Sequence, residues 1–144
     1  MGKTYFMDPN GNYKEVTDLA KLKADIVDNF ETFWMDGSGD GYFEYFAENG
    51  EKASLLIGPN VEYGMYLHFM DRDDKGNGVD LLSLYDAARL DEVAETAEEI
   101  YASVGLFLPV EKAWEAIVDF VERGKPSDKV TWITPDDIPD EGNW

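Results

Sequence analysis

The sequence predicts a single α+β domain, in which an antiparallel β-meander is packed by two main helices over residues 18–30 and 110–123. Two observations lead to this prediction. Apolar residues recur at helical spacing in those two segments, whereas residues 31–86 contain short segments of alternating apolar and polar residues, separated by turn formers. The chain has 144 residues and no linker long enough to separate two domains, so we assign residues 1–144 to one domain.

The N-terminal segment predicts two short strands followed by a helix. Residues 3–7 and 13–16 are strand candidates, joined by the turn formers of residues 8–12. Thr17 is the expected N-cap of the helix over 18–30. The apolar residues on one side of this helix are Leu19, Leu22, Ile26 and Phe30.

The central part of the chain predicts the meander. Asn49-Gly50 lies between two strand candidates and is the strongest short-range hairpin signal, and Gly58-Pro59-Asn60 is expected to turn the chain again. In residues 62–70 apolar side chains alternate with a mixed set, as in a sheet covered on one face. The predicted strands are 31–35, 42–48, 51–57, 62–70 and 79–85, with a polar loop at 71–78.

The C-terminal third contains the best-defined helix and strand. Over residues 110–123 the apolar side chains fall within an arc of roughly 160°, while Pro109 suits the first helical position and Gly124 follows the last. Residues 130–133 predict a closing strand, and residues 134–144 an acidic surface tail. For residues 86–103 a helix and irregular structure are both compatible with the pattern, and residues 103–108 predict a short strand.

Composition limits the classes of partner. Thirty-one acidic residues stand against twelve basic ones, a net charge of −19, which opposes binding to nucleic acid or to an anionic membrane. The same charge favours a partner with a basic surface; the alternative interpretation is that it only keeps the protein in solution. The sequence has no apolar stretch of the length of a membrane span or a signal peptide, so we expect a cytoplasmic protein.

No residue pattern indicates an enzyme or a cofactor site. Cysteine is absent, which excludes disulfides, thiolate metal sites and cysteine catalysis. The single histidine, His68, is not accompanied by a Gly-x-Ser-x-Gly motif that would supply a nucleophile. Residues 36–41, DGSGDG, resemble the start of a calcium loop, but Ala47 stands at the twelfth position, where a bidentate glutamate is needed. Solvated turns are the preferred interpretation of this loop and of the acidic loop at 71–80, with weak calcium binding as the alternative.

Tyrosines interleaved with acidic residues make the meander the expected contact surface for a partner. Tyrosine is enriched at interface hot spots, and carboxylates pair well with arginine and lysine. About half of these tyrosines are expected in the core instead. The predicted contacts are the acidic loops at 36–40 and 71–74 and exposed side chains of the meander: Asp36, Asp40, Tyr42, Glu44, Tyr63, Tyr66, Asp71, Asp73 and Asp74.

The C-terminal helix and strand contain the pattern P-x3-A-x6-F-x3-G-x7-W, formed by Pro109, Ala113, Phe120, Gly124 and Trp132. This pattern resembles the C-terminal signature of immunity protein family 1 of bacterial polymorphic toxin systems. The preceding segment 103–108, SVGLFL, is also similar to the approach to that helix in the family. The variable α+β region of the family suits residues 1–86.

The resemblance implies a cytoplasmic antidote that binds a cognate toxin domain encoded nearby and occludes it without catalysis. Toxins of such systems are often nucleic-acid deaminases or nucleases, whose basic substrate groove the charge of this chain complements. The resemblance also implies structural roles for the signature residues: Trp114 and Phe120 toward the core, Gly124 as the helix cap and Trp132 on the closing strand. We expect a monomer in the free state and no cofactor. Two alternatives are a DNA-mimicking inhibitor of a nucleic-acid enzyme and a weak calcium-dependent binding module.

Overall fold

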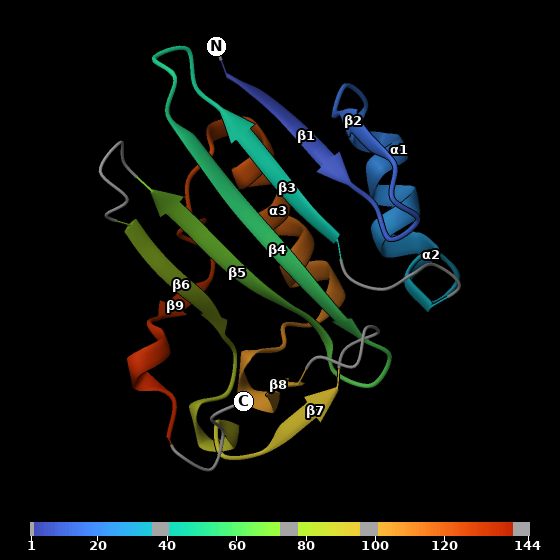
Figure 1. Ribbon diagram of the computed structural model, residues 1–144. Coiled ribbons are helices and arrows are strands. Elements are labelled where there is room, and N and C mark those ends of the chain that lie inside the picture. Colours follow the sequence, from blue (N-terminus) through green and yellow to red (C-terminus); the bar gives the residue numbers. More distant parts are fainter. Residues whose placement is uncertain (1, 36–40, 73–77, 96–100, 140–144) are drawn as a thin grey trace.

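The computed structural model describes residues 2–35, 41–72, 78–95 and 101–139 of the chain. Within these residues the main element is a seven-stranded antiparallel sheet of order β2-β1-β3-β4-β5-β6-β9 (Figure 1). Its strands are β1 (Lys3–Met7), β2 (Tyr13–Glu15), β3 (Gly41–Phe46), β4 (Lys52–Asn60), β5 (Gly64–Arg72), β6 (Gly78–Leu84) and β9 (Thr131–Ile133). From β3 to β6 the neighbours in the sheet are also neighbours in the chain, which confirms the predicted α+β domain with a β-meander.

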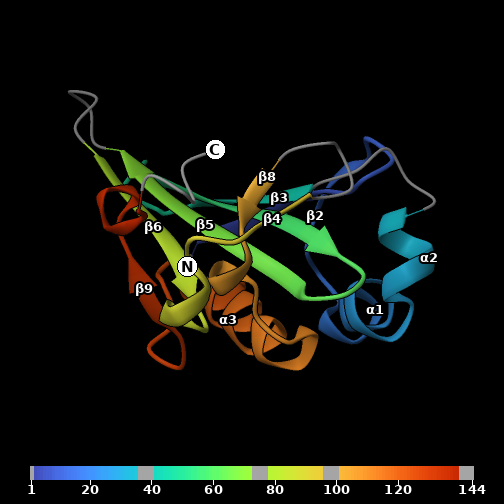
Figure 2. The same ribbon diagram turned by 90° about the horizontal axis from the view of Figure 1, so that it is seen from below.

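Helices cover one face of this sheet. The predicted C-terminal helix is α3 (Val110–Arg123), and it lies behind the central strands in Figure 1, whereas Figure 2 shows it on the same side of the sheet as α1. The N-terminal helical segment consists of α1 (Leu19–Lys23), a π-helical turn η1 (Ala24–Asp28) and α2 (Phe30–Met35). Short 3-10 turns are η2 (Ala87–Arg89), η3 (Val104–Leu106) and η4 (Pro135–Asp137). None of the described helices has the length and apolar character needed to cross a membrane.

The main core lies between the sheet and these helices. Alternate residues of β4 and β5 point toward α3, so that Leu55, Ile57 and Leu67 are buried against the apolar side of that helix. Burial of one such side chain stabilises the fold by about 1.5–3 kcal/mol. Large side chains that join them in this core are Ile26, Trp34, Phe43, Phe69, Ile117 and Phe120.

A smaller apolar cluster lies on the opposite face of the sheet, at the end where β4 turns into β5. Met65 and Leu67 face α3, so Tyr66 between them faces the other way. The chain after β6 covers this end with η2, η3 and a two-stranded sheet of β7 (Val93–Glu95) and β8 (Tyr101–Ser103). The buried members of this cluster are Tyr66, Leu82, Leu90, Ala102, Leu106 and Phe107.

Hydrogen bonds hold the segment after β8 against the sheet. Met65 and Leu108 exchange two backbone hydrogen bonds of 3.0 and 2.8 Å. The buried Ser83 hydroxyl accepts a hydrogen bond from the Leu67 N–H at 2.9 Å and donates one to the Leu106 carbonyl at 2.7 Å. These contacts fix the position of the chain that leads directly into α3.

The helical N-terminal segment extends further than predicted. Residues 31–35, expected as a strand, form α2. The reason is tertiary packing: Trp34 is completely buried and its indole N–H donates to the Ile26 carbonyl at 3.3 Å. The N-cap is Asp18 rather than Thr17, because the Asp18 carboxylate accepts hydrogen bonds from the first-turn N–H groups of α1.

Two other segments also differ from the sequence-based expectation. Residues 58–60 were expected to turn, but they continue β4, and the turn follows at 61–63. Pairing of β4 with β3 ends at Ile57, so Pro59 lies where β4 has become an edge strand on that side, a position that tolerates proline. Within 103–108, Ser103 ends β8 and Val104–Leu106 form η3, where a strand was expected.

Candidate functional site

The sheet face turned away from α3 is free of described helices over most of its area (Figure 1). The register brings its side chains together in rows. In one row Tyr42, Leu56 and His68 lie opposite one another on successive strands, and in the next row Ser54 is the neighbour of Glu44. We call this surface the open face; it comprises Tyr5, Tyr13, Tyr42, Glu44, Phe46, Lys52, Ser54, Leu56, His68, Met70 and Asp80.

Three aromatic rings form one corner of the open face. The Tyr5 and Tyr13 rings are stacked with centroids 5.3 Å apart, and the Phe46 ring meets Tyr5 edge-on at 5.7 Å. Tyr13 and Phe46 are 41% and 37% exposed. We call these three residues the aromatic corner. Such a group offers a large apolar contact area with little loss of side-chain entropy on binding, because its members already hold one another in place.

A polar network borders the aromatic corner. The Tyr13 hydroxyl donates to Glu44 Oε1 at 2.7 Å, and the Lys52 ammonium group pairs with Glu44 Oε2. Partial burial and the neighbouring Glu44 carboxylate raise the pKa of Tyr13 to about 12. Burial acts to raise the pKa of Glu44, but hydrogen bonds from Lys52 and Tyr13 outweigh it and lower that pKa. Glu44 is therefore held as an anion beside the rings.

A second polar pair lies further along the open face. His68 Nε2 lies 3.0 Å from Asp80 Oδ1, across β5 and β6. The described residues contain no group of three or more His, Asp or Glu side chains that could hold a metal ion. Weak calcium binding was the alternative interpretation of the acidic loops at 36–41 and 71–80. Residues 36–40 and 73–77 of these loops lie outside the described residues.

The structure separates the residues predicted as partner contacts. Tyr42 and Glu44 do lie together on the open face. Tyr66 was expected to be exposed, but it is only 2% exposed, because η3 and Phe107 pack on that end of the sheet. Tyr63 is half-buried in the turn after β4, with the Arg89 guanidinium stacked 5.2 Å from its ring centre.

The predicted acidic contacts do not join this surface. Asp71 lies on β5 opposite Ala53 and faces the helix-covered side, near Arg123 at the end of α3. The other predicted acidic contacts lie outside the described residues: Asp36, Asp40, Asp73 and Asp74. The acidic side chains of this face are Glu44, which pairs with Lys52, Asp80, which lies beside His68, and Glu15, which lies opposite Tyr5 on β2.

The signature residues occupy structural positions. Pro109 is the N-cap of α3 rather than its first helical residue, and Ala113 and Phe120 are buried against the sheet, with Trp114 half-buried beside them. Two further signature residues follow the helix. Gly124 ends α3 with a φ of 68°, and Trp132 lies on β9 and donates its indole N–H to the Ser127 carbonyl at 2.8 Å.

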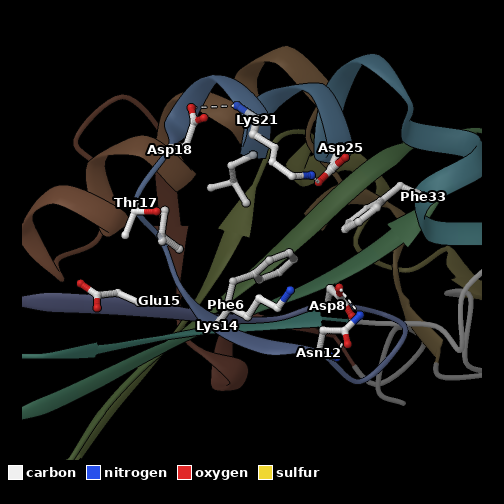
Figure 3. Close-up of a pocket in the computed structure, with 12 residues that line it drawn as sticks. Phe6, Asp8, Asn12, Lys14, Glu15, Thr17, Asp18, Lys21, Asp25 and Phe33 are labelled. Atoms are coloured by element: carbon white, nitrogen blue, oxygen red, sulfur yellow. Dashed lines mark hydrogen bonds and ion pairs between the residues drawn. The ribbon is translucent and has the colours of Figure 1, made fainter.

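A separate cleft lies between the β1–β2 hairpin and the helix α1 (Figure 3). Phe6 and Leu22 are the apolar residues of β1 and α1 in its lining, and Figure 3 shows Lys14 of β2 beside Phe6. Most polar groups at its rim take part in local structure: Lys21 pairs with Asp25, and the Asp8 carboxylate accepts hydrogen bonds from Asn12. Asp18 on the same rim caps α1. The polar groups of the cleft therefore stabilise the β1–β2 hairpin and α1, and we do not assign a binding site to it.

Sequence reasoning did not identify the aromatic corner. A usable signal was present, because the 8–12 turn sets Tyr13 opposite Met7, two residues from Tyr5 and on the same face of β1, and the 47–51 turn sets Phe46 opposite Lys52. Pairing of β1 with β3, which brings Tyr5 next to Glu44, connects segments about forty residues apart and has no local signature.

Comparison of the chain with protein-family models, with curated proteins and with solved structures finds no match.

Proposed function

We propose that this chain is an acidic immunity protein that binds a cognate toxin domain and occludes it, without catalysis of its own. The observation that carries the proposal is the open face, where exposed aromatic side chains lie on a chain of net charge −19. Aromatic side chains supply the buried centre of interfaces, and an acidic protein attracts a basic partner. The pattern from Pro109 to Trp132 supports the proposal through its resemblance to immunity protein family 1.

The proposed partner is a cytoplasmic-acting toxin domain that modifies or cleaves nucleic acid, because such a domain needs a basic substrate groove. A stable interface of ordinary size buries about 800 Å² on each partner. That is about a tenth of the 7700 Å² accessible surface of this protein. The open face spans several strands, so it offers enough area for a monomeric protein to cover such a groove.

Co-expression with the toxin domain encoded by the neighbouring gene tests this proposal. We expect growth of the toxin-expressing cells to be restored and a one-to-one complex to co-purify at low ionic strength. The association rate constant should fall steeply as salt is added, because electrostatic attraction is screened. Continued toxicity together with the absence of a complex would contradict the proposal, and a salt-independent rate would assign the attraction to apolar contacts alone.

A pair of variants tests the open face as the contact surface. Phe46→Ser removes an exposed ring from the aromatic corner, and Tyr85→Ser removes a 57% exposed ring elsewhere. We expect the first change to weaken toxin binding about tenfold or more, as for an interface hot spot, and the second to have almost no effect. Equal affinities of the two variants, each with an unchanged melting temperature, would place the contact on another surface.

A further inference from the structure

A second surface lies at the end of the sheet, where three segments distant in the sequence meet. The end of η1 and the start of α2, the turn between β4 and β5, and the start of α3 enclose a groove of about 680 Å³. In Figure 1 these segments converge at the lower right of the molecule. We call this the α2–α3 groove; its lining includes Val27, Phe30, Val61, Tyr63, Pro109 and Val110 among its apolar residues.

The floor of the α2–α3 groove is apolar and fixed. Val27, Phe30 and Val110 are half-buried and pack against the main core. Val61 differs from them, because it stands at the tip of the turn and is 60% exposed, the highest value among the exposed large apolar side chains of the described residues. A valine so placed offers apolar area to a partner side chain without any rearrangement of the floor.

The rim of the α2–α3 groove carries charge of one sign. The lining contains no lysine, arginine or histidine. It contains four exposed carboxylates, those of Asp28, Glu31, Glu62 and Glu111. In the described part of the chain none of these four has an ion-pair partner, whereas Asp25, Glu92 and Asp119 each pair with a basic side chain. The groove thus combines an apolar floor with uncompensated negative charge.

We propose that the α2–α3 groove is a docking site for a partner segment in which an apolar side chain is flanked by lysine or arginine. The apolar side chain would lie between Val61 and Phe30, and the cations would pair with the carboxylates of the rim. This complementarity excludes a second copy of the chain as the occupant, since two copies would bring like charges together. That the segment belongs to a toxin domain rests on the proposed function; the chemistry of the groove does not.

Binding of a short peptide tests the groove without knowledge of the natural partner. The probe is a peptide of about six residues that alternates arginine and leucine, with both ends blocked, titrated at low ionic strength while the amide resonances of the protein are followed by NMR. We expect the amide resonances that shift to belong to residues 27–32, 61–64 and 110–111, and Val61→Ser to weaken binding. Shifts spread evenly over the acidic surface, or no shifts at all, would overturn the proposal.

Matched double variants separate the groove from the net charge. Glu62→Gln with Glu111→Gln removes two carboxylates of the rim, whereas Glu115→Gln with Glu122→Gln removes two exposed carboxylates of α3 outside the groove. Both variants have the same net charge. We expect about fivefold weaker peptide binding for the first and less than about twofold for the second. Equal weakening of both would show that binding follows total charge, and would overturn the proposal.

The same variants distinguish this inference from the proposed function. If the neighbouring toxin binds wild type and both double variants equally, the groove is not its docking site and the immunity function stands. If the peptide binds in the groove but the toxin neither binds nor is inhibited, the groove stands and the immunity function fails. Weaker toxin binding by the rim variant alone, with an unchanged melting temperature, supports both.

Discussion

Gly64 shows how a single residue sets the position of the segment before α3. Its backbone has a φ of 108°, and a Cβ atom there would lie 2.0 Å from the Leu108 carbonyl oxygen. The close approach of the two chain segments allows Met65 and Leu108 to exchange their backbone hydrogen bonds. Glycine is thus required at position 64 both by conformation and by space.

We expect Gly64→Ala to lower the free energy of unfolding by about 2–4 kcal/mol, since strained backbone and a steric clash add. Gly50→Ala is the matched control, because Gly50 has a similar φ of 90° but a Cβ atom there would meet nothing within 4 Å. The control should cost about 1–2 kcal/mol from conformation alone, because a Cβ atom is unfavourable in the left-handed region. Chemical denaturation of both variants measures the difference, and equal losses would show that the clash is relieved at no cost.

Tyr13 provides a prediction that depends on pH. Partial burial and the Glu44 carboxylate raise the pKa of its hydroxyl from 10.0 to about 12. The unfolded chain therefore ionises first, so the contribution of this group to stability is fully present below about pH 10 and is lost as the pH rises toward 12. We expect NMR titration of the tyrosine ring carbons to find a late-ionising signal with a pKa of about 12 that is absent in Tyr13→Phe. In Glu44→Gln its pKa should fall toward 10; an unchanged value would assign the whole shift to burial.

At the scale of elements, α3 packs closely on the sheet because it presents small residues to it. Ala113 and Ala116 are completely or almost completely buried on the side of α3 that faces the strands. We expect Ala113→Leu to destabilise the fold by about 1–3 kcal/mol through overpacking. Glu115→Leu, at an exposed position of the same helix, is the control and should change stability by less than about 0.5 kcal/mol. Thermal unfolding compares the two; a stable Ala113→Leu variant would indicate that the helix can move away from the sheet.

Elements with a strong local pattern were predictable from the sequence, and elements defined by tertiary contacts were not. The α3 helix was predicted from 3.6-residue periodicity, and the β3–β4 hairpin from Asn49-Gly50, where Gly50 adopts a φ of 90°. By contrast, α2 depends on the burial of Trp34, and the position of Pro59 beyond the paired part of β4 depends on where β3 begins, at Gly41. No local propensity encodes either contact.

The candidate site was less predictable than the fold for the same reason. Alternation placed Tyr42 and Glu44 on one face, but it also placed Tyr66 there, and only the path of the chain through η3 shows that this end is covered. The aromatic corner depends on pairing of β1 with both β2 and β3. A surface built from several strands requires the register of the whole sheet, which one sequence does not specify.

At the scale of the whole molecule, the charge of −19 acts on stability as well as on binding. Like charges repel one another more in the compact state than in the extended chain, so the folded protein is destabilised at low ionic strength. Added salt shortens the screening length from about 30 Å at 0.01 M to about 8 Å at 0.15 M. The ion pairs that salt would weaken lie mainly at the surface, for example Lys21–Asp25 and Arg89–Glu92, and contribute little.

We therefore expect the melting temperature to rise by several degrees between about 0.01 and 0.15 M sodium chloride, because relief of repulsion outweighs the loss of surface pairs. Calorimetry at pH 7 measures this shift. The double variant Glu115→Gln with Glu122→Gln is the control, since a smaller net charge should reduce the response to salt while both carboxylates lie outside the core. A melting temperature that falls with salt would show that favourable ion pairs, and not repulsion, dominate the electrostatics of this fold.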